Sequence, residues 1–194
     1  LPPCGGDTMA MKYCTPSRPG TFLMTRRQRL RRVGILCCHF LRNLAFYRAG
    51  WRGGELRRQD LFWINVNGNF LDVAVLEWCK LFGDKWGQQS WRKVITDHEA
   101  FMAGLLASVK MTEAEFGAYI DEMKTYRDKF VAHLDELAVA NIPRLRVARK
   151  CVSYLYDYLR AHEQEEDCFH DAPPSAAVFY RDIAVQGRQE YGAP

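Results

Sequence analysis

The sequence has no apolar run long enough to cross a membrane, since a spanning helix needs about 20 apolar residues. The best candidate, residues 33–41, is short and contains His39. The chain also has no C-x-x-C pair and no cysteine–histidine cluster at zinc spacing, although it contains seven cysteines. An odd number of irregularly spaced cysteines indicates free thiols in a reducing compartment rather than disulfides or structural zinc. These absences favour a cytoplasmic protein that spans no membrane.

Alternating strand patterns and internal repeats are missing as well, whereas helical spacing is present from Thr25 onward. A first helix is predicted over 25–47, before a glycine-rich turn at 50–54. A second begins near Asp60, and the residues predicted on its buried face are Trp63, Val66, Phe70, Val73 and Leu81, with Ala74 and Trp78. Three more are predicted to begin near Asp97, at the capping box of Thr112 and Glu115, and with Pro143 in the first turn. The sequence therefore predicts an all-α fold, an up-and-down bundle of about five helices.

The two ends of the chain differ in composition from its middle. Residues 1–23 contain four prolines and the pair Gly5-Gly6, without an apolar period, and are interpreted as a poorly structured leader or upstream extension. Residues 24–165 form the predicted helical domain, whose size suits one hydrophobic core. Residues 166–194 are interpreted as a tail with one short helix from Ser175 to about Val185.

Positive charge is concentrated near the start of the predicted domain. Residues 24–58 carry ten arginines and a single acid, Glu55, in a chain with a net charge of +4. The rest of the chain is therefore net negative, and a basic end on an acidic body favours an anionic partner such as RNA. The candidate phosphate contacts are Arg26, Arg27, Arg29, Arg31 and Arg32. The alternative is an ordinary solvated helix start.

The stretch 126–135 holds the residues with the clearest chemical potential. Arg127 and His133 are separated by five residues near the end of a predicted long helix. On an ideal α-helix the two side chains would point about 120° apart and lie about 9 Å apart along the axis. They would not meet on one face. This geometry predicts either a bend in the helix or a site completed by a second copy of the chain.

The Arg-x5-His spacing, with a polar residue after the arginine, resembles the motif of the HEPN superfamily. The flanking residues 127–135 (RDKFVAHLD) and the aromatic segments 62–70 (FWINVNGNF) and 77–83 (EWCKLFG) also resemble HEPN domains of toxin and abortive-infection systems. The similarity spans roughly residues 30–160. It implies a HEPN-like helical bundle that forms a homodimer, with two copies of the motif facing each other across a cleft.

The resemblance also implies a reaction, a metal-independent RNA cleavage of the toxin or phage-defence type. His133 would be the general base on the ribose 2′-hydroxyl, since imidazole titrates near neutral pH. Arg127 would hold the scissile phosphate and stabilise its added charge, and Asp128 would orient the arginine or the histidine. The products would carry 2′,3′-cyclic phosphate and 5′-hydroxyl ends. No metal or other cofactor is expected, and a partner antitoxin or other regulatory protein would restrain the enzyme.

Further candidates come from the helix predicted to begin at Asp60. Asn65, Asn69 and Asp72 share one face of it, so Asn69 is a candidate RNA contact; the alternative is polar helix surface or a buried hydrogen-bonded pair. Trp86 and Trp91 are candidates for stacking on bases. The alternative function for the whole chain is a catalytically inactive HEPN module that binds RNA or a partner protein.

Overall fold

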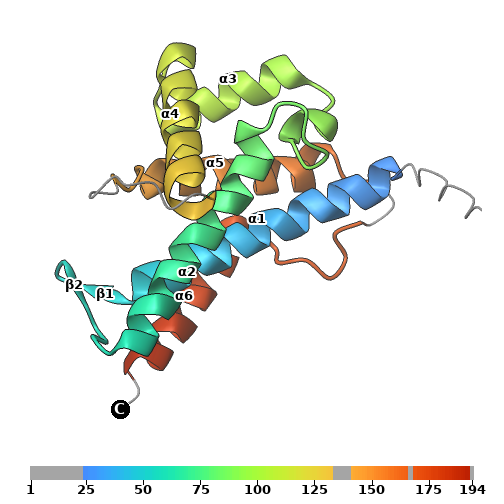
Figure 1. Ribbon diagram of the computed structural model, residues 1–194. Helices are drawn as coiled ribbons and strands as arrows, with labels where there is room; N and C mark the ends of the chain where they lie inside the picture. Colours follow the sequence, from blue (N-terminus) through green and yellow to red (C-terminus); the bar gives the residue numbers. More distant parts are fainter. Residues whose placement is uncertain (1–23, 133–140, 166–167, 193–194) are drawn as a thin grey trace, which may run out of the picture.

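The computed structural model describes residues 24–132, 141–165 and 168–192. The predicted all-α class is confirmed, since within these ranges six α-helices form a bundle with only a two-stranded hairpin beside them (Figure 1). The α-helices are α1 (Arg26–Ala49), α2 (Leu61–Trp78), α3 (His98–Val109), α4 (Glu113–Tyr126), α5 (Leu145–His162) and α6 (Ala176–Gly192). Two π-helices extend α2 and α4, namely η1 (Cys79–Gly83) and η3 (Arg127–Ala132), and η2 (Trp91–Lys93) is a 3₁₀ turn.

Local capping chemistry sets where the helices begin. The Thr25 hydroxyl oxygen accepts a hydrogen bond from the backbone amide of Gln28. The side-chain oxygen of Gln28 in turn accepts one from the backbone amide of Thr25. Asp60 caps α2 and Asp97 caps α3 through their side chains. The capping box predicted at Thr112 is present at the start of α4. These side chains satisfy amide groups that have no partner inside the helix.

The sequence predicted no strands, and this is wrong for residues 51–56. Strands β1 (Trp51–Arg52) and β2 (Glu55–Leu56) pair antiparallel around Gly53 and Gly54. Both glycines have positive φ, 61° and 89°, as a tight two-residue hairpin turn requires. Each strand has only two residues, too few for an alternating pattern to be recognised in the sequence.

The C-terminal part of the face predicted to be buried on the second helix lies in the core, with Ala74, Trp78 and the following Leu81 fully buried. The prediction is wrong for Val73, which is 37% exposed, whereas Leu71 and Val75 lie in the core. Helix α2 packs against α1 and against η3.

The C-terminal helix is longer than predicted and belongs to the packed body. Helix α6 runs beside α1 in Figure 1 and continues to Gly192. A Cβ on Gly187 would lie 2.9 Å from the Ala49 Cβ, so glycine permits the close approach of α6 to α1. The centroid of the Tyr191 ring lies 4.8 Å from that of the Trp63 ring.

The predicted position of Pro143 in the first turn of α5 is wrong, because α5 begins at Leu145 after an Arg144 cap.

The described cysteines are free thiols, with Cys37, Cys79, Cys151 and Cys168 buried and Cys38 half-buried. No helix in the described ranges is long and apolar enough to span a membrane. The predicted leader, residues 1–23, lies outside the described residues.

Candidate functional site

Arg127, the first residue of the motif, begins a π-helix. The α-helical hydrogen bonds of α4 end at Tyr126, and residues Arg127–Ala132 follow in π conformation. In a π turn the carbonyl of residue i bonds to the amide of residue i+5, and such turns are rare and frequently lie at functional sites. The ideal-helix geometry assumed from the sequence therefore does not apply between Arg127 and Ala132. His133, the motif histidine, lies outside the described residues.

Two carboxylates hold the Arg127 guanidinium. Its Nε donates to Asp128 Oδ1 at 2.7 Å, and its Nη1 donates to Asp84 Oδ1 at 2.9 Å. The Arg127 side chain is 20% exposed, while both aspartates are substantially exposed. The hydrogen bond to Asp128 is the largest influence raising the pKa of Arg127 well above its usual range, with Asp84 adding to it. Arg127 is thus a fixed, fully charged group whose charge is compensated by two acids.

Asp84 reaches Arg127 because a second π-helix ends α2. The Asp84 amide donates to the Cys79 carbonyl at 2.9 Å, closing η1. The Cys79 thiol in turn donates to the Met123 carbonyl of α4 at 3.7 Å. Burial raises the pKa of Cys79 to about 12, so this thiol stays protonated at neutral pH. Each π-helix therefore packs against the α-helix that the other one extends.

Asp72 joins the same crossing of α2 and α4. Tyr126, the residue before Arg127, hydrogen-bonds to the Asp72 carboxylate. Burial raises the pKa of Asp72 and also that of Tyr126, which lies at about 12. A titratable group with a shifted pKa beside a motif arginine is typical of a functional site, although ion-pair networks produce such shifts too. Asn69, on the same side of α2 as Asp72, is exposed to solvent.

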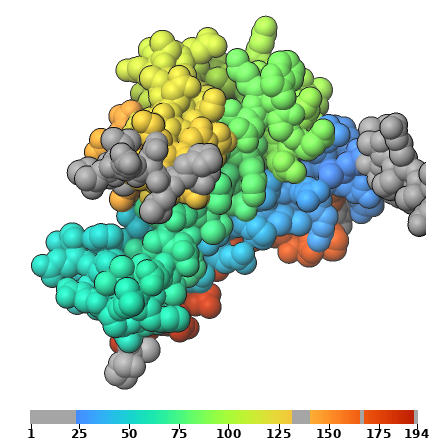
Figure 2. Space-filling view, viewed as in Figure 1, coloured from blue at the N-terminus to red at the C-terminus, as the bar shows by residue number. Residues whose placement is uncertain are grey.

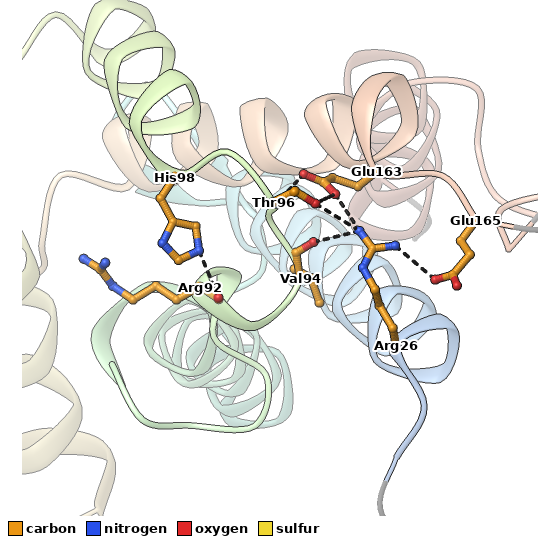
Figure 3. Close-up of polar contacts among 7 residues, drawn as sticks. All are labelled: Arg26, Arg92, Val94, Thr96, His98, Glu163 and Glu165. Atoms are coloured by element: carbon orange, nitrogen blue, oxygen red, sulfur yellow. Dashed lines mark hydrogen bonds and ion pairs between the residues drawn. The ribbon is translucent and has the colours of Figure 1, made fainter.

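Two of the arginines predicted to bind RNA form ion pairs with acids of the C-terminal half. The Arg26 guanidinium donates to Glu163 at 2.6 Å and to Glu165 at 3.0 Å, and also reaches Thr96 (Figure 3). Arg31 forms a two-pronged pair with Asp171, at 2.8 and 2.7 Å. The basic helix start and the acidic C-terminal segment thus partly compensate each other.

The remaining predicted arginines differ in exposure. Arg27 and Arg32 are exposed at the start of α1. The Nε of Arg29 is buried and has no hydrogen-bond partner among the described residues. The structure does not bring any of these three to Arg127 through a contact.

A large cleft lies beside Asp84. It has a volume of about 710 Å³ and is lined by the loop after η1 and by α4, including Trp86, Arg92, Asp121 and Lys124. Of the tryptophans considered for base stacking, Trp91 is 2% exposed and belongs to the core, while Trp86 is 87% exposed. In Figure 2 the yellow C-terminal part of α4 lies beside the green segment around the end of α2, in agreement with the contact between α4 and η1.

The described parts of the chain contain no group of three or more histidine, cysteine or acidic side chains placed to hold a metal ion.

The sequence did not identify two residues that lie beside Arg127, namely Asp84 and Tyr126. Tyr126 precedes the motif directly, but nothing in the sequence links Asp84 to a residue 43 positions later.

Comparison with known proteins gave no match to any family model, curated protein or solved structure.

Proposed function

We propose that this protein is a metal-independent RNA endonuclease of the HEPN type, acting as a homodimer in a cytoplasmic toxin or phage-defence system. The observation that supports it most directly is the state of Arg127. This arginine begins a π-helix, is oriented by Asp84 and Asp128, and keeps a fifth of its side chain exposed. A fixed guanidinium at a break in helical structure suits the positioning of a phosphate.

In the proposed reaction, His133 takes the proton from the 2′-hydroxyl of the nucleotide before the cut. The 2′-oxygen then forms a bond to phosphorus while the bond from phosphorus to the 5′-oxygen breaks. The leaving 5′-oxygen takes up a proton, and the products are a 2′,3′-cyclic phosphate and a 5′-hydroxyl. Arg127 stabilises the added negative charge on the phosphate oxygens. DNA lacks the attacking hydroxyl, so the reaction is specific for RNA.

A second copy of the chain is part of the proposal. The side of α2 that carries Asn65 and Asn69 also exposes Phe62 and Val73, which are 67% and 37% exposed. The exposed face therefore belongs to a helix that packs against η3, which carries the start of the motif. A partner placed on it by two-fold symmetry would bring the two motifs toward each other. Asn69 would then lie at the edge of the shared cleft.

A second candidate function is favoured by one observation. The carboxylates of Asp84 and Asp128 already accept from two of the five N–H donors of Arg127 and compensate its charge, which weakens the attraction of the guanidinium for a phosphate. A HEPN module that binds RNA or a regulatory protein without cutting would not need a phosphate at Arg127. In that case Arg127 would stabilise the crossing of α2 and α4.

The experiment that tests the proposal is cleavage of mixed cellular RNA by the purified full chain in EDTA. Wild type is compared with Arg127→Ala, His133→Ala and Arg188→Ala, the last removing an exposed arginine of α6. The proposal expects cyclic phosphate ends from wild type and Arg188→Ala only. Intact RNA in every lane over a wide range of protein concentration would support the inactive module. Equal cutting by all four proteins would indicate a contaminant or another site.

Mixed dimers test whether each site uses both copies. In a dimer of one Arg127→Ala and one His133→Ala protomer, a site built across the interface still has Arg127 from one copy and His133 from the other. Mixing the two inactive variants should then restore a fraction of wild-type cleavage. No recovery, with mixed dimers shown to form, would place both groups of each site in a single copy.

A further inference from the structure

A basic pocket lies on the loop between α2 and α3, away from the motif itself. It has a volume of about 430 Å³ and is lined by Lys85, Trp86, Arg92, Lys93 and His98. These lining residues include three permanent cations at neutral pH and no acid. A concave basic surface without a compensating carboxylate favours an anionic ligand.

Of the two tryptophans considered for base stacking, only Trp86 lines this pocket. Trp91 is buried, and the Arg92 guanidinium lies over its ring at 4.5 Å from the centroid. Trp86 instead offers 87% of its surface to solvent, the largest exposed fraction among the large apolar side chains of the described residues. An exposed indole beside basic side chains presents a flat apolar face on which another ring can stack.

The pocket is built on short, hydrogen-bonded turns. The Gly87 amide donates to the Asp84 carbonyl at 3.0 Å, and the Lys93 amide donates to the Ser90 carbonyl at 2.9 Å. The His98 Nε2 lies 3.1 Å from the Arg92 carbonyl, an atom that only accepts, so Nε2 carries the hydrogen (Figure 3). These bonds fix the backbone of the cations while their side-chain ends remain available.

The basic pocket is continuous with the large cleft beside the motif. Lys85, Trp86 and Arg92 line both. The large cleft also reaches Asp84, whose carboxylate holds Arg127. A chain of nucleotides seated on Trp86 could therefore extend along the cleft toward Arg127.

We propose that this pocket binds single-stranded RNA, with one base stacked on Trp86 and the adjoining phosphates on Lys85, Arg92 and Lys93. An aromatic platform beside a row of cations is the arrangement by which proteins hold single strands without reading their sequence. In a duplex the faces of the bases are covered by their neighbours, so the indole would find none to stack on. The inference rests on the proposed function and adds that the substrate is held in single-stranded form.

The test is binding of the full chain to a fluorescein-labelled, 2′-O-methylated RNA of roughly 12 nucleotides, within common single-strand site sizes. Methylation blocks cleavage, so anisotropy reports binding alone. Trp86→Ala should weaken binding roughly 5- to 100-fold, the loss expected for one stacked base. Trp86→Phe should retain most of the affinity. Lys93→Gln should lower the slope of log affinity against log salt by about 0.7. Arg188→Ala should leave binding unchanged.

Binding by Trp86→Ala within twofold of wild type, or no binding of the single strand at all, would overturn the inference. Equal loss on a duplex probe would overturn it as well. Failure of the proposed function is distinguishable: if the methylated probe binds through Trp86 but unmodified RNA is never cut, the pocket stands and the nuclease does not. If RNA is cut normally by Trp86→Ala, and this variant also binds normally, the nuclease stands and the pocket does not.

Discussion

Asp84 Oδ1 accepts a hydrogen bond from Arg127 Nη1 at 2.9 Å, joining the end of the second helix to the start of the motif. The contact depends on two π-helices, because η1 directs the chain to Asp84 and η3 begins at Arg127. The hydrogen bond to Asp84 orients the Arg127 guanidinium. The Asp84 carboxylate also competes with any phosphate for binding to this arginine. Asp84 therefore sets how readily the motif arginine can bind an anion.

Replacement of this competitor should strengthen RNA binding. Asp84→Asn keeps the shape and removes the charge, so we expect affinity for the methylated RNA to rise roughly two- to fivefold, the range of a partly exposed ion pair. Anisotropy at one fixed salt concentration measures it. Asp121→Asn removes another acid of the same cleft and controls for the general change in charge. A fall in affinity with Asp84→Asn alone would instead make Asp84 a positioning residue for Arg127.

Glu163 should be a strong determinant of stability. Its side chain is 3% exposed and accepts from the Thr96 amide at 2.6 Å, the Thr96 hydroxyl at 2.7 Å and Arg26 at 2.6 Å. In Glu163→Gln either orientation of the amide places its NH₂ group opposite a donor. We expect a loss of about 1–3 kcal/mol in the free energy of unfolding, measured by urea denaturation. Glu165→Gln, at the exposed partner of Arg26, should cost less than about 1 kcal/mol; equal losses would contradict this account.

Asn67 should hold three segments together. It accepts from Trp51 Nε1 at 3.1 Å and donates to the Tyr47 carbonyl at 3.0 Å and the Tyr191 hydroxyl at 2.9 Å. Asn67→Ala removes all three bonds and leaves the buried Tyr191 hydroxyl without this partner, so we expect it to lower the free energy of unfolding by about 2–4 kcal/mol. Asn69→Ala, at an exposed position of the same helix, should change it by less than about 0.5 kcal/mol. A small effect at Asn67 would mean that water replaces these bonds.

The parts of the fold that local chemistry controls could be predicted from the sequence. Helix starts at Thr25, Asp60, Asp97 and Thr112 follow from side chains that cap amides within three residues. Periodicity gave the helical class for the same reason. The hairpin at 51–56 and the exposure of Val73 could not be predicted, because each depends on which helices pack against each other.

The candidate site was predictable only in its sequence-local part. The spacing of Arg127 and His133 singles out the motif, but the ion pair with Asp84 joins residues 43 positions apart. Arg26 and Glu163 are 137 positions apart, so interpreting Arg26 as a phosphate contact could not take its carboxylate partner into account. The sequence presents Trp86 and Trp91 as two similar candidates for base stacking. In the structure Trp86 is exposed and Trp91 is buried.

The ion pair of Arg31 and Asp171 should make stability depend on pH in the acid range. The hydrogen bond to Arg31 lowers the pKa of Asp171 to about 2, below its usual value. A carboxyl whose pKa is lower in the folded state stabilises the fold above its unfolded pKa and loses that effect as pH falls through the folded pKa. The pair's contribution should therefore be complete at pH 6 and decline between about pH 4 and 2.

Asp171→Asn tests this directly. The difference in the free energy of unfolding between wild type and the variant should be largest near pH 6 and shrink toward pH 2, in urea denaturation at each pH. The difference in the free energy of unfolding between wild type and Arg31→Gln should shrink over the same pH range, because this variant lacks the other half of the pair. The carboxyl carbon shift of Asp171 in NMR gives its pKa independently, and a midpoint near 4 would contradict the prediction. Asp182→Asn, at the exposed pair with Arg181 in α6, is the matched control for removing one carboxylate from the surface.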